Sequence, residues 1–345
     1  MVGRIAMGIQ APIIRQGDDL VQIVVDSILR NTELQNGDII GITESVVARA
    51  QGNYVTVDEI AAETDRLFGK DAVIYLLCPI YSRNRFSMIL KGIARSAKKI
   101  YIDMPDFDEV GNPRGVNPWT GINIMNYYKD ICNQENCECH INPTEEEIPT
   151  NTQYLDCSLS PQKNLGWAPL MCLTSYFPDK CKWGLLGSNK ANEETLKLFP
   201  NDILAQELVE NIQKRIQDKL GVHVEIMIYG DGCFKDPVSG IWEFADPVTS
   251  PAYTKGLEGS PNEIKLKAFA DDKYKDLSGQ ELTDAIKAEI RSKETALKGN
   301  MSSQGTTPRR YVDLLASLMD LTSGSGDAGT PIVLVRNYFK NYGSE

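Results

Sequence analysis

Residues 36–53, NGDIIGITESVVARAQGN, constrain the fold of this chain more than any other stretch. The apolar run GDIIGIT at 37–43 has the length and composition of a buried strand, as found in sheets that are covered on both faces. A short helical pattern follows at once, and polar side chains gather at the junction. The segment therefore predicts a strand that runs straight into a helix, which requires a fold containing both kinds of element.

Helices and strands alternate along both ends of the sequence. Amphipathic helical patterns cover 17–34, 57–71, 201–221 and 278–299, strands are predicted at 37–43 and 222–232, and 86–105 and 311–339 each combine a helix with a strand. This alternation indicates an α/β or mixed α+β fold rather than a repeat or a helical bundle.

Between residues 104 and 180 the periodicity weakens, and Pro, Asn, Cys and aromatic residues become frequent. Such composition is typical of irregular structure. We expect one domain in two sequence parts, 1–103 and 181–345, with an irregular Cys- and Pro-rich insertion at 104–180.

The charge of the chain limits the partners that it can have. The 345 residues carry a formal net charge of −11, which disfavours nucleic acid or an anionic membrane as the main partner. No apolar run approaches the roughly 18 residues of a membrane span, and the first 20 residues lack the pattern of a secretion signal. We therefore expect a cytoplasmic protein.

The strand-to-helix junction is a candidate anion site. Thr43 is placed to cap the helix, Ser45 lies in its first turn, and Arg49 lies one turn further on. A helix start presents free N–H groups and the positive end of a dipole, which attract anions. The alternative interpretation is a plain cap at Thr43 with a solvated Arg49.

A second candidate site lies in IMIYGDGCFKDP, where Asp231 follows an apolar strand. Ligands of open α/β sheets gather beyond the carboxyl ends of strands, and a carboxylate there suits Mg²⁺ or Mn²⁺. Asp236, Glu243 and Asp246 are candidates for a second carboxylate. The alternative is an ordinary Asp-Gly turn.

Four side chains in CNQENCECH, namely Cys132, Cys137, Cys139 and His140, have atoms that bind zinc. Their spacing matches no common structural zinc pattern, so reduced and partly buried thiols are the favoured interpretation. Because the chain has only two histidines, nucleophilic catalysis based on histidine is poorly supported.

Two other stretches carry a weaker indication of ligand binding. Arg83, Arg85, Lys91 and Arg95 would attract an anion, but a solvated helix face is the favoured interpretation. The glycine-rich stretch TSGSGDAGTP at 322–331 lacks the pattern of a phosphate-binding P-loop, so a helix end and loop is favoured there.

Taken in order, several motifs resemble the γ-glutamyl ligases that add glutamate to the deazaflavin coenzyme F-420. GDDL at 17–20 and GDIIGITESVVARAQGN at 37–53 are similar to the family's N-terminal pattern. WGLLGSNKANEETLKLFP, YGDGCFKDP and the closing DLLASLMDLTSGSGDAGTPIVLVRNY resemble its later motifs. The resemblance covers both ends of the chain and leaves out about 104–180.

This resemblance implies a γ-glutamyl-ligase-like mixed α/β fold, an intertwined homodimer and a bound Mg²⁺ or Mn²⁺. It also implies GTP-dependent ligation, in which a small-molecule acid is activated as an acyl phosphate and attacked by the amine of L-glutamate. Thr43, Ser45, Arg49, Ser188 and Asn189 would then bind nucleotide or substrate. Asp231 would bind the metal.

The chain departs from the family pattern at several of its polar positions. Ser45 and Arg49 stand where the family has lysines, Gln51 stands for a glutamate and Asn53 for an arginine. Leu186 replaces an aspartate that would help to hold metal. The alternative function is therefore a protein of the same fold that binds a nucleotide or small molecule and has lost catalysis.

Overall fold

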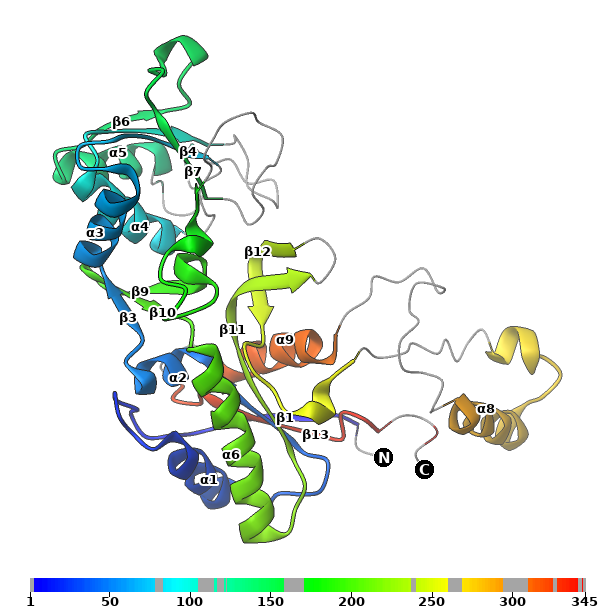
Figure 1. The fold of residues 1–345 in the computed structure, drawn as a ribbon. Helices are drawn as coiled ribbons and strands as arrows, with labels where there is room; N and C mark the ends of the chain where they lie inside the picture. Colours follow the sequence, from blue (N-terminus) through cyan, green and yellow to red (C-terminus); the bar gives the residue numbers. More distant parts are fainter. Residues whose placement is uncertain are drawn as a thin grey trace.

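The computed structural model describes residues 3–77, 83–104, 115–116, 121, 123–157, 171–236, 240–259, 269–293, 310–324, 328–340 and 343. These residues form three sheets with helices packed against them, and the fold is mixed α/β as the sequence predicts. Figure 1 shows one sheet with α1, α6 and α9 at the bottom, a small sheet in the middle, and a parallel sheet at the top.

The first sheet has the strand order β1-β13-β2-β11-β12 and holds both ends of the chain. Its strands are β1 (Ile5–Ile9), β2 (Ile39–Thr43), β11 (Glu225–Asp236), β12 (Gly240–Thr249) and β13 (Ile332–Arg336). β2 is the central strand, parallel to β11 and antiparallel to β13. The predicted buried strand is confirmed, since Ile39, Ile40 and Ile42 are fully buried.

Helices cover both faces of this sheet (Figure 1). α1 (Leu20–Asn31) and α6 (Asp202–Leu220) lie on one face, and α9 (Tyr311–Ser323) lies on the other. Because successive side chains of a strand point to opposite faces, Ile40 packs under α1 and α6 whereas Ile39 packs under α9. The two cores hold β2 in the middle of the molecule.

A second sheet is wholly parallel, with the strand order β6-β5-β4-β7-β8. Its strands are β4 (Val73–Leu77), β5 (Lys99–Asp103), β6 (Glu138–Ile141), β7 (Gln153–Asp156) and β8 (Met171–Cys172). The helices α3 (Val57–Phe68), α4 (Arg83–Ser96) and α5 (Ile124–Gln134) share one core with it.

The described part of 104–180 differs from the irregular structure that the sequence predicts. It contains α5, β6 and β7, and the two strands pair with β5 and β4 of the first sequence part. Strands of four residues leave little periodicity in a sequence. Hydrogen bonds to distant strands, rather than local pattern, therefore order β6 and β7.

A third sheet of three strands joins the other two regions (Figure 1). It has the order β3-β10-β9, built from β3 (Tyr54–Thr56), β9 (Ser188–Asn192) and β10 (Thr195–Leu198). α2 (Glu44–Gln51) connects β2 of the first sheet to β3. The remaining elements are η1 (Glu145–Glu147), η2 (Leu173–Ser175), η3 (Gly184–Gly187), η4 (Lys255–Leu257), η5 (Phe269–Lys273) and α8 (Gly279–Lys293).

Local capping explains where several predicted helices begin and end. The Asp19 carboxylate accepts a hydrogen bond from the backbone of Gln22 at the start of α1, and Thr56 with Glu59 forms a capping box before α3. Gly221 ends α6 in the left-handed conformation. Among the described helices, none combines the length and the apolar character needed to cross a membrane.

Candidate functional site

β2 and β11 are parallel neighbours, and their pairing ends at the same end of the first sheet. The two predicted sites lie next to each other there. Thr43, the last residue of β2, is paired with Tyr229 of β11. The following residues are also in contact, because a Cβ on Gly230 would overlap the Cγ atom of Glu44. The start of α2 therefore lies beside the segment that carries Asp231, although the two are far apart in sequence.

Asp231 does not end its strand, contrary to the sequence prediction. β11 continues to Asp236 because β12 turns back and pairs with it, placing Asp231 opposite Val248. The parallel pairing with β2 stops before Asp231, and the register shifts between Asp231 and Cys233. The side chains of residues 231–249 lie outside the described part of the structure.

The described residues contain no group of three His, Cys, Asp or Glu side chains that would hold a metal ion. Asp231 and the further candidates Asp236, Glu243 and Asp246 belong to the range whose side chains are not described. Leu186 lies in η3 and has no oxygen atom to offer. One carboxylate plus substrate phosphates is a common way for proteins to hold Mg²⁺.

Thr43 occupies the cap position of α2, but its side chain makes no capping hydrogen bond. The structure therefore does not show the side-chain cap that the alternative interpretation requires. Ser45, one residue into α2, is contacted from another sheet, since Nζ of Lys197 donates a hydrogen bond to its Oγ atom. Lys197 lies on β10, opposite Tyr54 of β3 and Asn189 of β9. This contact brings a cation to the predicted anion site.

Ser188 and Asn189 are neighbours in β9 with different surroundings. Ser188 is buried, and its Oγ atom donates a hydrogen bond to the Leu185 carbonyl at 2.6 Å. Its own carbonyl accepts a hydrogen bond at 2.6 Å from Nε of Arg85, which is also buried. These hydrogen bonds connect Ser188 to η3 and to α4. Asn189 is half-buried beside Lys197 and is the more accessible of the two.

The basic residues of α4 belong to the protein framework rather than to a solvated face. Lys91 forms an ion pair with Glu194, and Arg95 forms one with Glu135 at 2.9 Å. The hydrogen bonds to Glu135 raise the pKa of Arg95. The side chain of Arg83 lies outside the described residues. These cations connect α4 to other elements.

Two positions that depart from the family pattern also connect elements. The Asn53 amide donates hydrogen bonds to the carbonyls of Phe199 at 2.6 Å and Lys180 at 3.0 Å. The Gln51 side chain accepts a hydrogen bond at 2.8 Å from the backbone of Asn201. Both amides fix the end of α2 to the segments that flank β10 and α6.

Arg49 lies in the last turn of α2 and is exposed. Its position four residues after Ser45 places both on the same side of the helix. In the described part of the chain its guanidinium has no hydrogen-bond or ion-pair partner. Arg49 therefore remains available to an anion near the junction.

The predicted cysteine cluster brings three thiols together where α5 ends and β6 begins. Hydrogen bonding to Cys137 and Cys139 raises the pKa of Cys132, and the bond from Cys132 lowers the pKa of Cys139. The Nε2 atom of His140 lies 2.7 Å from the Glu138 carboxylate. The three cysteines are free thiols, and no metal-binding group is found among the described residues.

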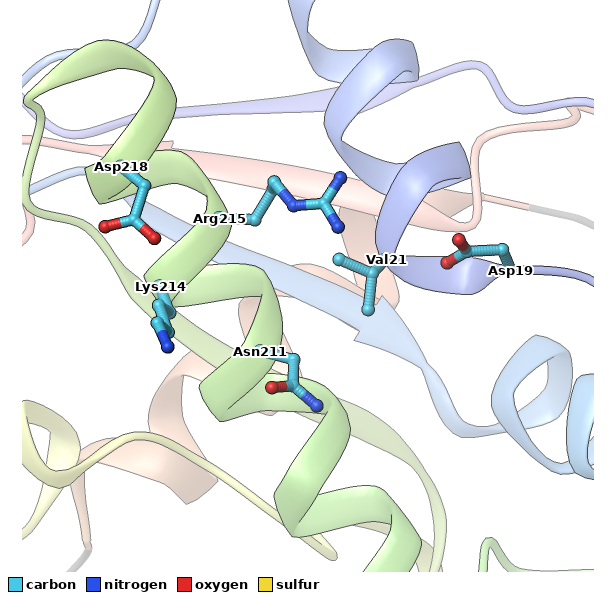
Figure 2. A pocket seen from close by; sticks show the side chains of 6 residues that line it. All are labelled: Asp19, Val21, Asn211, Lys214, Arg215 and Asp218. Atoms are coloured by element: carbon cyan, nitrogen blue, oxygen red, sulfur yellow. The ribbon is translucent and has the colours of Figure 1, made fainter.

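A pocket of about 450 Å³ lies between α1 and α6 (Figure 2). It is lined by Asp19, Val21, Asn211, Lys214, Arg215 and Asp218. Charges of both signs project from the facing helices, and Arg215 donates a hydrogen bond to Gln22 at 3.1 Å. No predicted site residue lines this pocket. Its composition is that of a solvated helix surface.

Two residues at the junction, Lys197 and Glu44, were not identified as site residues from the sequence. Lys197 stands in the short polar–apolar alternation TLKL, which indicates a strand but not what its polar face contacts. Glu44 is the first residue of α2 and is only 4% exposed. Acidic residues at helix starts are usually exposed, so the sequence does not predict this burial. Pairing between distant segments places both of them.

A family model described as F420-0:gamma-glutamyl ligase matches residues 8–337. The matched range includes 104–180, the stretch that the sequence motifs left out. No curated protein matches the chain closely enough to count as a relative.

Proposed function

This chain belongs to the F420-0:gamma-glutamyl ligase family, and we propose that it forms an amide between a small-molecule acid and an amino acid at the expense of a nucleotide. One observation carries this proposal. Within a chain that the family model matches almost end to end, the start of α2 and the Asp231 segment lie at one sheet edge. GTP is the proposed nucleotide and L-glutamate the proposed amino acid.

The proposed reaction has two steps. The carboxylate of the acid attacks the γ-phosphorus of GTP, which forms an acyl phosphate and releases GDP. The amine of glutamate then attacks the acyl carbon, phosphate leaves, and the nitrogen loses a proton as the amide forms. Phosphoryl transfer depends mainly on in-line positioning and neutralisation of charge. Lys197 and Arg49 are the cations near the junction that supply this charge, and Ser45 and Asn189 offer hydrogen bonds.

We propose that Mg²⁺ or Mn²⁺ enters with the nucleotide. In this proposal Asp231 is the carboxylate ligand and phosphate oxygens supply further ligands, because Leu186 stands where the family has an aspartate. A bound divalent ion would neutralise charge on the transferred phosphoryl group. The assembly is proposed to be a homodimer, and light scattering during size-exclusion chromatography would distinguish it from a 38.4 kDa monomer.

A thermal-shift experiment tests the proposed function. The intact protein is heated with GTP or ATP, each with and without Mg²⁺ or Mn²⁺, and Asp231→Ala is treated in parallel. A ligand that binds only the folded state at 100 times its Kd adds about 2.7 kcal/mol of stability. We expect stabilisation by GTP with metal that Asp231→Ala loses. If no nucleotide–metal pair shifts the melting temperature, the ligase proposal is wrong.

Phosphate release then distinguishes an enzyme from a binding protein. The assay combines GTP, Mg²⁺ or Mn²⁺, L-glutamate and candidate acids, beginning with the unglutamylated precursor of coenzyme F-420. Release that requires acid and amine together supports the ligase. Nucleotide binding without release from any acid favours a binding protein that has lost catalysis, a second candidate supported by Leu186.

A further inference from the structure

Lys197 has a fixed place in the molecule. It lies on β10, the middle strand of the β3-β10-β9 sheet, and is paired on one side with Tyr54 and on the other with Asn189. Its neighbours Leu196 and Leu198 are fully buried. Since side chains alternate along a strand, Lys197 points away from that core, and its Nζ atom reaches Ser45 in the first turn of α2.

Nearby lysines are neutralised by carboxylates, whereas Lys197 has no carboxylate partner in the described part of the chain. The ion pairs around it are Lys91–Glu194, Lys180–Glu59, Lys182–Asp202 and Lys190–Glu193. Among the described residues, the Ser45 hydroxyl is the one hydrogen-bond partner of the Lys197 ammonium, which forms no ion pair with them. Lys197 is nevertheless half-buried. A partly desolvated cation without a counter-charge is unfavourable, in a protein whose acidic residues exceed its basic ones by 11.

The groups around Lys197 indicate which kind of ligand would balance its charge. The Ser45 hydroxyl, the Asn189 amide and the Lys197 ammonium offer hydrogen-bond donors within a small region. The Thr43 side chain does not cap α2, so it leaves the first N–H groups of that helix without this acceptor. A phosphate group, with several acceptor oxygens and a negative charge, matches this set.

We propose that Lys197, held by Ser45, binds a phosphate group of the nucleotide. This inference rests on the proposed function and deepens it by assigning a phosphate-binding residue that lies on a different sheet from β2 and β11. A charge-assisted hydrogen bond contributes about 1.5–3 kcal/mol, so its loss weakens binding roughly 10- to 100-fold.

Calorimetry of GTP and of inorganic triphosphate tests the assignment, with Mg²⁺ present and L-glutamate as a carboxylate probe. The variants are Lys197→Met and Lys197→Arg, with Lys190→Met as the matched control, because Lys190 is half-buried on the adjacent strand and paired with Glu193 at 2.6 Å. We expect Lys197→Met to bind GTP and triphosphate about 10- to 100-fold more weakly than the parent. Lys197→Arg should recover most of the lost affinity, and Lys190→Met should bind both ligands like the parent.

The possible failures are distinguishable. If the parent protein binds no nucleotide, the proposed function fails. If the parent binds GTP and Lys197→Met binds it equally well, only the assignment of Lys197 fails. The same conclusion follows if Lys197→Met weakens L-glutamate but not triphosphate. Should Lys197→Met not fold, Lys197→Gln replaces it, and unliganded melting temperatures equal to the parent's show that any loss is in binding.

Discussion

Gly230 and Glu44 are in direct contact at the edge where β2 and β11 diverge, although 185 residues separate them in the sequence. A side chain on Gly230 would occupy the space of the Glu44 Cγ atom. Because Glu44 is buried at the first position of α2, this contact fixes the start of that helix relative to the strand that carries Asp231.

Replacing Gly230 by alanine is expected to displace Glu44 and with it the start of α2. Overpacking of this kind costs about 1–3 kcal/mol, and we expect nucleotide binding to weaken as well. Urea unfolding and calorimetry with GTP measure the two effects. Gly3→Ala is the control, because a Cβ there meets no described atom within 4 Å. Parent-like stability and affinity in Gly230→Ala would show that the contact is dispensable.

Arg336→Met is expected to destabilise the fold strongly. Arg336 at the end of β13 makes two hydrogen bonds to Asp38, at 2.9 and 2.7 Å, and Asp38 is only 1% exposed. Removal of one partner from a buried ion pair leaves an uncompensated charge and costs about 3–5 kcal/mol. The free energy of unfolding in urea is the measurement.

The ion pair between the exposed Arg66 and the half-buried Glu63 provides the control, because Arg66→Met there should cost under about 1 kcal/mol. Adding Asp38→Asn to Arg336→Met should restore part of the stability, since it removes the unpaired charge. A double variant less stable than Arg336→Met contradicts this account.

Asn53→Ala is expected to loosen the connection between α2 and the three-stranded sheet. The side chain donates to the carbonyls of Phe199 and Lys180, and leaving them unsatisfied costs about 1–3 kcal/mol. Denaturant unfolding measures the loss. The exposed Asn211 on α6 is the control, and Asn211→Ala should stay within about 0.5 kcal/mol of the parent. Equal effects of the two substitutions would contradict the assigned role.

Cys139 is expected to be the most reactive thiol of its cluster. The hydrogen bond from Cys132 lowers the pKa of Cys139, so at pH 7 to 8 more of it is thiolate than of an ordinary cysteine. By contrast, burial raises the pKa of Cys181 to about 12. Alkylation by iodoacetamide between pH 6 and 9, followed by mass spectrometry, gives the rate at each site.

The rate at Cys139 should rise at a lower pH than the ordinary thiol pKa of about 8.5, and Cys181 should stay unmodified. Cys132→Ala should move the Cys139 profile to higher pH, because the hydrogen bond that stabilises the thiolate is lost. A profile unchanged by Cys132→Ala shows that Cys132 does not tune Cys139.

Most elements with a long periodic pattern are predictable from this sequence. α1 and α6 follow from apolar periodicity, and β2 follows from its short apolar run. The caps at Asp19 and Gly221 agree with the start of α1 and the end of α6. The family resemblance also follows from short motifs at the two ends. The order in β6 and β7 does not, because their hydrogen-bond partners lie in other parts of the chain.

The apolar run and the helical pattern after it are enough to predict a buried strand that runs into a helix at Thr43, within a mixed α/β fold. The residues that meet this junction, Gly230 from β11 and Lys197 from β10, follow from the tertiary structure alone. The tertiary structure also buries Ser188, whose hydroxyl donates a hydrogen bond to the Leu185 carbonyl. Local propensity acts within a few residues, whereas a site is assembled by strand pairing between segments that the sequence keeps far apart.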